Sequence, residues 1–305
     1  MARAFWTGKL SLPMKLVVNT SNAVAWITGN TRDTGAMKER IRMGYDGVTS
    51  NHVTKYDKLG LEFQTKAAGA LLEDIDLAGK TVLDVGGGTG VLSLLALKAG
   101  AASVVCGDIS EYMLSQARGK AAAQLDSPDR IDFRQLDAES LPFADGSFDV
   151  VLSSMSFGLF PDQKKAAAEM IRVLRNGGHL GLGAHGPEHY WEAIDASFRV
   201  ITKRYVLGYR LEFWPLGEKE IQQMLIQGGL TEVRSRRLTW RNDFETGGQA
   251  FDFFAAISGS FWYAKFPPDK RLKESQKARD YFERRRVTQI TDDVIMAYGR
   301  KPLTS

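Results

Sequence analysis

Apolar and polar positions divide the chain into three parts. Residues 36–77 carry apolar side chains at helical spacing, and a turn at 78–80 ends this part. From residue 81 to residue 184, short apolar runs alternate with helical stretches, which is typical of a doubly wound parallel sheet. After residue 184 the pattern is mixed, with amphipathic helices, aromatic clusters and two further strand-like runs.

The alternating part and the segment after it contain seven strand-like runs. We expect strands at 81–85, 103–108, 131–136, 148–154, 179–184, 234–240 and 293–298. Helices are expected at about 90–99, from Ser110 onward, from Pro161 to Leu174, at about 188–203 and at 217–228. The sequence therefore predicts the α/β class, with a doubly wound, mostly parallel seven-stranded sheet.

The same pattern predicts the domain organisation. Residues 1–77 are expected to form an N-terminal extension and helical cap, and residues 78–305 the main domain with a lid insertion at about 187–288. Aromatic side chains are concentrated in this insertion, at Tyr205, Tyr209, Phe213, Trp214, Phe251, Phe253, Phe254, Phe261, Trp262 and Tyr263. So many aromatic side chains outside the main sheet predict a lid over an apolar pocket, although aromatic residues at helical spacing also build ordinary cores.

Composition limits the class of protein. The 305 residues are 44% hydrophobic and 25% charged, as in ordinary globular proteins, and no apolar run reaches the ~18 residues of a membrane span. The single cysteine, Cys106, excludes a disulfide within the chain and agrees with a reducing compartment, so we expect a cytoplasmic protein. The formal net charge of +4 is not accompanied by a nucleic-acid-binding motif, and no nucleic acid partner is expected.

The clearest chemical signal is the turn from Asp84 to Gly90, which joins an apolar strand to a helix. Glycine at positions 86, 88 and 90 lets the backbone approach a ligand closely at the carboxyl end of the strand. A dinucleotide fingerprint would need a further glycine where Val91 stands, so a bound pyrophosphate is not expected. A tight turn without a ligand is the plainer alternative.

Three further segments come after the glycine turn in order. Asp108 ends the second strand, the segment 136–149 reads LDAESLPFADGSFD, and the segment 172–180 reads RVLRNGGHL. Together with the turn, they resemble the motifs of class I S-adenosylmethionine-dependent methyltransferases across residues 81–184. This resemblance implies a Rossmann-like methyltransferase fold and S-adenosyl-L-methionine as the cofactor, with its amino-acid part on the glycine turn.

The resemblance also implies roles for individual residues. Asp108 would accept hydrogen bonds from the ribose hydroxyls, and Asp137 would contact the adenine amino group. Ile109 and Met113 would pack against the adenine face, although both are equally suited to a protein core. The complete predicted cofactor-binding set is Asp84, Gly86, Gly88, Gly90, Asp108, Ile109, Met113, Asp137, Ala138, Ser154 and Tyr56.

Catalysis in this family depends mainly on alignment, because the sulfonium is already an activated methyl donor. His185 comes directly after the fifth strand and is the predicted base for a carbon or phenolic oxygen acceptor. In related enzymes an N-terminal helical segment closes over the cofactor, which makes Tyr45 the second predicted catalytic residue and Tyr56 a cofactor contact. A hydrogen-bonded loop histidine and core tyrosines are the alternatives. No metal is expected, because no histidine pair has a third ligand at suitable spacing.

The segment SFGL at 156–159 resembles the S-F-G-L of ubiquinone/menaquinone C-methyltransferases, but FPD stands at 160–162 where those enzymes have Arg-Asn. The resemblance therefore implies methyl transfer to a small-molecule acceptor, bulky and partly apolar, without identifying a quinone. A lipophilic acceptor would also bring the protein into peripheral contact with a membrane. One alternative is an S-adenosylmethionine-binding protein that does not methylate. Another is methylation of a macromolecule, which the lack of an Asn-Pro-Pro-Tyr motif after the fourth strand disfavours.

Overall fold

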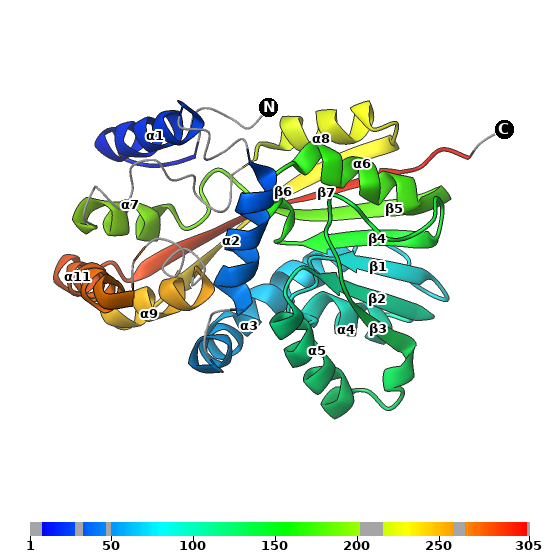
Figure 1. Ribbon diagram of the computed structural model, residues 1–305, viewed down its shortest axis with the longest axis horizontal. Helices are drawn as coiled ribbons and strands as arrows, with labels where there is room; N and C mark the ends of the chain where they lie inside the picture. The colour runs from blue at the N-terminus through cyan, green and yellow to red at the C-terminus, as the bar shows by residue number, and fades with distance from the viewer. Residues whose placement is uncertain are drawn as a thin grey trace. The chain divides into compact units, whose positions relative to one another are not determined.

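The computed structural model of the protein describes residues 8–27, 33–46, 50–201, 216–258, 266 and 268–303 (Figure 1). The chain forms two compact units. The first, here called the helical unit, comprises Met1–Gly60, Gly186–Pro215 and Thr239–Asp293, and the second, the sheet unit, comprises Leu61–His185, Leu216–Leu238 and Val294–Ser305. Across the described residues, no helix is both long enough and apolar enough to cross a membrane.

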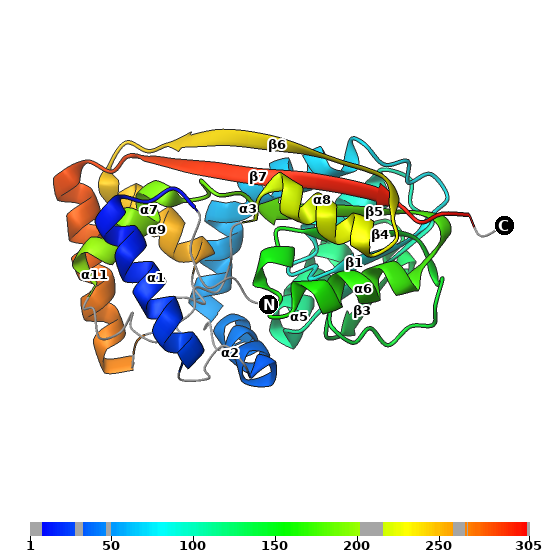
Figure 2. The same ribbon diagram turned by 90° about the horizontal axis from the view of Figure 1, so that it is seen from above.

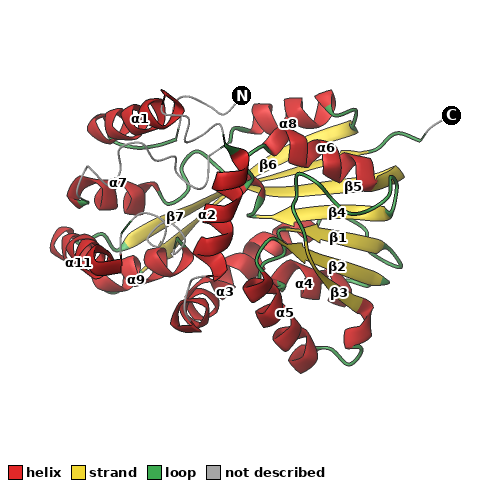
Figure 3. Cartoon of the chain, viewed as in Figure 1, coloured by secondary structure: helices red, strands yellow, loops and turns green. Residues whose placement is uncertain are grey.

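A seven-stranded sheet organises the fold, and Figure 3 draws its strands in yellow. The strands are β1 (Thr81–Val85), β2 (Ser103–Asp108), β3 (Ile131–Gln135), β4 (Phe148–Ser154), β5 (Leu174–His185), β6 (Thr231–Asp243) and β7 (Gln289–Arg300). They lie in the order β3-β2-β1-β4-β5-β7-β6. The pairs β1–β2, β1–β4, β2–β3 and β4–β5 are parallel, and β7 is antiparallel to β5. The predicted α/β class and the mostly parallel sheet are therefore confirmed.

Strands β6 and β7 are neighbours in the sheet (Figure 2). Each contributes residues to both units. Both are longer than the apolar runs at 234–240 and 293–298 predicted, with 13 and 12 residues. In β6, exposed and half-buried positions alternate along much of the strand. Such a strand can extend beyond its apolar residues, because the backbone hydrogen bonds to the neighbouring strand define its length and the side chains do not.

Four helices of the sheet unit come after its strands. They are α4 (Val91–Lys98), α5 (Glu111–Gln124), α6 (Gln163–Val173) and α8 (Glu218–Gln227), with the short turns η1 (Pro128–Arg130) and η2 (Phe157–Leu159). Helix α5 begins after Ser110 as predicted, because the Ser110 side chain accepts a hydrogen bond from the Met113 N–H. Helix α6 begins after Asp162, whose carboxylate accepts from the Lys165 N–H. Apolar side chains of α6 and α8 form one core with β4, β5 and β7.

The helical unit contains α1 (Leu12–Ile27), α2 (Thr34–Asp46), the first part of α3 (Ser50–Leu72), α7 (Trp191–Val200), α9 (Gly247–Ile257) and α11 (Pro268–Arg285). Its core is rich in aromatic side chains. The ring of Phe251 meets that of Phe282 edge-on at 5.4 Å between centroids, and Phe254 stacks on the same ring at 6.5 Å.

This aromatic core corrects one expectation. Phe251, Phe253 and Phe254 are 2%, 6% and 4% exposed. Their rings fill the interior of the helical unit and do not line an apolar pocket as expected, whereas the lid itself stays a prediction. The other aromatic residues of the predicted lid lie outside the described residues: Tyr205, Tyr209, Phe213, Trp214, Phe261, Trp262 and Tyr263.

The unit boundaries also differ from the expected cap at 1–77 and insertion at 187–288. The end of α3 belongs to the sheet unit, where Leu71 is fully buried and the Ala70 carbonyl accepts a hydrogen bond from the Tyr298 hydroxyl at 3.2 Å. Residues 216–238 belong to the sheet unit as well, because α8 contributes to its core. The helical unit is therefore assembled from three separated stretches of the chain.

Candidate functional site

The glycine turn after β1 is held in a left-handed backbone conformation. The φ angles of Gly86, Gly88 and Gly90 are +75°, +54° and +84°, a region that favours glycine. The N–H groups of Gly86 and Gly87 donate to the Gly107 carbonyl at 2.8 and 2.9 Å, which ties the turn to β2. The turn is thus fixed before any ligand arrives.

The space around the glycines differs from one position to the next. A Cβ on Gly86 would lie 2.5 Å from Cβ of Ser156, and one on Gly90 would lie 3.0 Å from Cβ of Ala117. A Cβ on Gly88 would meet only the terminal methyl of Met113, at 3.9 Å. Gly86 and Gly90 are therefore needed for packing within the protein. Gly88 instead faces a cradle that a side chain would fill, as expected where a ligand passes close to the backbone.

Asp84 lies beneath this turn and is almost completely buried. Its Oδ2 atom accepts a hydrogen bond from the Ser93 hydroxyl at 2.7 Å, whereas its buried Oδ1 atom has no hydrogen-bond partner among the described residues. Burial raises the pKa of Asp84 to about 7, and the negative charge of Asp108 acts in the same direction. An acceptor atom without a donor fits a ligand that brings a positively charged donor, such as an ammonium group.

Asp108 links the end of β2 to the glycine turn. Its Oδ2 atom accepts from the Gly88 N–H and its Oδ1 atom from the Ser110 N–H, both at 2.9 Å. The carboxylate therefore does not serve as the N-cap of α5, a role that Ser110 fills. Of the two predicted adenine contacts nearby, Ile109 is half-buried, and Met113 is buried with its methyl group near Gly88.

Asp137 lies just after β3, the edge strand of the sheet, which pairs with β2. Its Oδ1 atom accepts from the Glu139 N–H at 2.9 Å, and a single bridge pairs Asp137 with Ser140. Asp137 is half-buried and Ala138 is buried. Glu139 in turn accepts from the Asp162 N–H at 2.8 Å, so this loop is anchored to the start of α6.

The sheet brings these positions together along one edge. Because β3, β2, β1 and β4 are adjacent and parallel, their carboxyl ends lie side by side. Asp137, Asp108, the glycine turn and Ser154 stand at those four ends in that order. In doubly wound sheets, ligands bind outside the carboxyl ends of the strands where the strand order reverses, which is the position of β1 and β4 here.

Sequence reasoning missed two serines that shape the site. The Ser156 hydroxyl donates to the Gly86 carbonyl at 2.6 Å, joining the loop after β4 to the glycine turn. Ser93 on α4 holds Asp84 through its hydroxyl. Met155, between Ser154 and Ser156, has a φ of +59°, which is unusual for a residue with a side chain. The SFGL segment at 156–159 contains Ser156. Its resemblance indicated a branch of the family, but it predicted no contact for Ser156.

The positions of the predicted catalytic residues fit their predicted roles less well. His185 ends β5 and is 9% exposed, and its burial lowers the pKa of the imidazole to about 3. A general base works best with a pKa near the operating pH, so this imidazole is poorly suited to remove a proton from an acceptor. Tyr45 is half-buried on α2 of the helical unit, and the side chain of Tyr56 lies outside the described residues. No described group of three metal-ligating side chains could hold a metal ion.

Residues 83–182 match the family model described as a methyltransferase domain. A demethylmenaquinone methyltransferase from Clavibacter sepedonicus is 30% identical over 221 residues, which cover 67% of this chain and 84% of that protein. The chain belongs to the S-adenosylmethionine-dependent methyltransferases. S-adenosylmethionine is accordingly its cofactor, and the open cradle at Gly88 and the buried acceptor atom of Asp84 fit this cofactor's amino-acid part.

Two further similarities place this methyltransferase among known proteins. A protein of Mycobacterium tuberculosis is 31% identical over 182 residues, or 59% of this chain, and the match spans 65% of that relative's length. The crystal structure of the YcgJ protein of Bacillus subtilis shares the fold, with a TM-score of 0.54 at 20% identity, over 78% of this chain and 99% of that one.

Proposed function

We propose that the protein transfers the methyl group of S-adenosylmethionine to a small-molecule acceptor that is bulky and partly apolar. The observation that carries methyl transfer is the open cradle at Gly88, placed at the carboxyl end of β1 in a methyltransferase. The name of the Clavibacter sepedonicus relative gives demethylmenaquinone as its acceptor, which supports an acceptor of the same broad kind here.

The edge of the sheet supports an assignment of residues to parts of the cofactor. The glycine turn receives the amino-acid part, with Asp84 Oδ1 accepting from its ammonium group. Asp108 accepts from the ribose hydroxyls, as acidic residues after the second strand of such sheets do. Asp137 and Ala138 border the adenine edge, and Ile109 and Met113 pack on its face. Ser154 and Tyr56 complete the proposed set.

When bound, S-adenosylmethionine would supply an activated methyl group for in-line displacement by the acceptor, with the electron pair of the broken carbon–sulfur bond left on S-adenosylhomocysteine and any proton of the attacking atom released to solvent. The protein's contribution is to hold the two partners in line and to exclude water. His185 stays neutral at physiological pH because its pKa is about 3. We therefore do not assign it the role of proton acceptor.

Product identification tests the proposed reaction. The protein would be incubated with methyl-labelled S-adenosylmethionine and a panel of reduced naphthoquinones, phenols and amines, with products identified by mass spectrometry. We expect label in one class of acceptor and an equal amount of S-adenosylhomocysteine. Tight cofactor binding without S-adenosylhomocysteine would instead support the alternative of a binding protein that does not methylate.

Asp108→Asn tests the cofactor assignment. The variant keeps the shape of the side chain but loses the charge that strengthens hydrogen bonds to the ribose, and its amide group faces the Gly88 and Ser110 N–H groups. Hydrogen bonds to charged groups contribute about 1.5–3 kcal/mol, so affinity for S-adenosylhomocysteine should fall roughly tenfold to hundredfold in titration calorimetry. Asp132→Asn, at an exposed position on β3, is the matched control and should bind normally. Equal affinity of Asp108→Asn and Asp132→Asn for S-adenosylhomocysteine would show that Asp108 does not bind the cofactor.

A further inference from the structure

Helix α1 carries an exposed apolar stripe along one side. Leu12, Leu16 and Ile27 are 73%, 62% and 71% exposed, and they are three of the eight large hydrophobic side chains that are exposed in the described part of the chain. Leu16 follows Leu12 by about one helical turn, and Ile27 follows Leu16 by about three turns, so the three side chains share one face. Exposed Thr20 and half-buried Ala23 lie between them on this face, and neither is charged. These five residues are here called the outer stripe.

The opposite face of α1 is buried in the helical unit. Met14 and Val18 are 7% and 2% exposed, and they belong to the aromatic-rich core of this unit together with Leu10, which lies just before the helix. A surface helix of a globular protein normally has polar and charged residues on the face away from the core. Helix α1 has mainly apolar residues on both faces instead, which is typical of a surface that a further partner covers.

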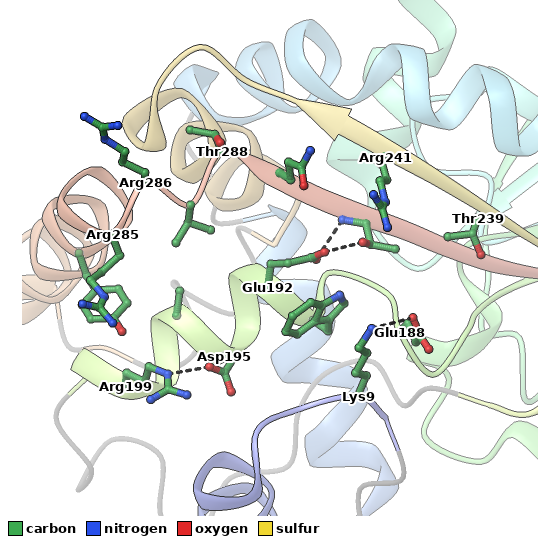
Figure 4. A pocket seen from close by; sticks show the side chains of 16 residues that line it. Lys9, Glu188, Glu192, Asp195, Arg199, Thr239, Arg241, Arg285, Arg286 and Thr288 are labelled. Carbon is green, nitrogen blue, oxygen red and sulfur yellow. Dashed lines mark hydrogen bonds and ion pairs between the residues drawn. The ribbon is translucent and has the colours of Figure 1, made fainter.

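The start of α1 is fixed on α7 (Figure 4). The Lys9 N–H donates to the Pro187 carbonyl at 2.7 Å, and Lys9 Nζ pairs with Glu188 at 3.4 Å. The Ser11 hydroxyl donates to Asp195 Oδ1 at 2.6 Å. Because these contacts and the buried face hold the helix on both sides of its first turn, the outer stripe stays turned away from the core.

The surroundings of the outer stripe are positively charged. Residues 1–32 contain Arg3, Lys9, Lys15 and Arg32 and no acidic residue, and Lys15 is the one charged residue of α1. The helical unit as a whole has 23 basic and 17 acidic residues, a net charge of +6, whereas the sheet unit has 17 and 19, a net charge of −2. The outer stripe therefore belongs to the basic part of the protein, which favours a partner with negative charge.

We propose that the outer stripe binds the surface of a bilayer that contains anionic lipids. Such a bilayer offers an apolar interior to the leucine side chains and negatively charged headgroups to Lys15. The 16 residues of α1 rise about 24 Å, less than the ~30 Å of the hydrocarbon core, so the helix lies along the surface. Pairing of two copies through the stripe fits less well, because α1 has no acidic residue to receive Lys15 of a second copy.

Cosedimentation of the full-length protein with large unilamellar vesicles tests the proposal. We expect binding to vesicles of phosphatidylcholine mixed with phosphatidylglycerol, weaker binding to phosphatidylcholine alone, and a decrease in binding to the mixed vesicles at high salt. The assay needs neither acceptor nor cofactor, so its result is independent of the proposed reaction. Failure to bind the mixed vesicles, or equal binding to both lipid compositions, would overturn the proposal.

Substitutions on α1 separate the outer stripe from general adhesion to lipid. The double variant Leu12→Gln with Leu16→Gln should bind the mixed vesicles at least about tenfold more weakly, because it removes two large apolar side chains from the interface. Lys15→Gln should weaken this binding roughly fivefold and leave binding to phosphatidylcholine alone unchanged. Leu272→Gln is the matched control, since Leu272 is 79% exposed on α11 of the same unit. The proposal fails if Leu272→Gln weakens binding as much as the double variant does.

Two further measurements exclude other causes of lost binding. The urea midpoint and the affinity for S-adenosylhomocysteine should match those of the wild type in every variant, which shows that the fold is kept. Sedimentation equilibrium then tests a second copy of the chain as the partner. A wild-type dimer that the double variant dissociates would assign the outer stripe to this second copy and overturn the proposal, whereas the same oligomeric state in both proteins supports the bilayer.

Discussion

Gly86→Ala is expected to abolish cofactor binding and to destabilise the sheet unit. The new methyl group would lie 2.5 Å from Cβ of Ser156, and alanine would have to adopt a φ of +75°. The left-handed conformation costs about 1–2 kcal/mol for a residue with a side chain, and overpacking costs about 1–3 kcal/mol more. Relief of the clash would move the turn away from the geometry in which it meets the cofactor.

Gly88→Ala separates the effect on binding from the effect on folding. Its methyl group would meet nothing closer than 3.9 Å, so this variant carries only the cost of its φ of +54° and should stay folded. It should still lose affinity, because the methyl group occupies the cradle. Gly69→Ala on α3, where a Cβ has nothing within 4 Å, is the control that should bind normally.

The measurements are titration calorimetry with S-adenosylhomocysteine and urea unfolding at constant pH. The double variant Gly86→Ala with Ser156→Gly should recover part of the stability, because it removes the atom that clashes. Wild-type affinity in both Gly86→Ala and Gly88→Ala would mean that the cofactor does not lie on this turn.

The strands and the residues at their carboxyl ends could be predicted because each depends on local sequence. A short apolar run that ends in glycines or in an aspartate indicates both a buried strand and the residues placed at its carboxyl end. The positions of Asp84, Asp108 and Asp137 near the ends of β1, β2 and β3 were predictable for this reason. The contact of Ser156 with Gly86 joins residues 70 positions apart, and only the tertiary fold brings them together.

Burial is the property that sequence reasoning judged least well. Phe251, Phe253 and Phe254 were expected in a lid, but aromatic residues at helical spacing give the same pattern when they fill a core. His185 was correctly placed at the end of a strand. Its environment was not predictable, because the loss of water around the ring depends on residues far away in the chain, such as Val294 on β7.

The buried groups Asp84 and His185 should give the sheet unit two opposing pH dependences. The folded pKa of Asp84, about 7, lies above its ordinary value of 3.8, so the stability it contributes is present below pH 3.8 and is lost as the pH rises toward 7. The folded pKa of His185, about 3, lies below its ordinary value of 6.5, so its contribution is present above pH 6.5 and is lost as the pH falls toward 3.

Between about pH 4.5 and 6.5 these two contributions have slopes of opposite sign, each of up to about 1.4 kcal/mol per pH unit. In Asp84→Asn, which imitates the protonated carboxyl group, His185 is the one of these two groups that remains, and the free energy of unfolding should rise with pH more steeply than in the wild type. In His185→Gln, Asp84 is the one of these two groups that remains, and the slope of the free energy of unfolding against pH should be lower than in the wild type. The slope of the free energy of unfolding against pH in the wild type should lie between the slopes of the two variants.

Urea unfolding of the wild type and both variants at pH 4.5, 5.5 and 6.5 measures these slopes directly. The exposed Asp132→Asn variant corrects for the general effect of removing a carboxylate and should behave like the wild type. Identical slopes in all four proteins would show that neither buried group titrates as its environment requires. With S-adenosylhomocysteine bound, its ammonium group beside Asp84 should lower the pKa of that carboxyl, so binding at pH 6 should release a proton. That release would appear as a binding enthalpy that depends on the buffer, and Asp84→Asn should remove it.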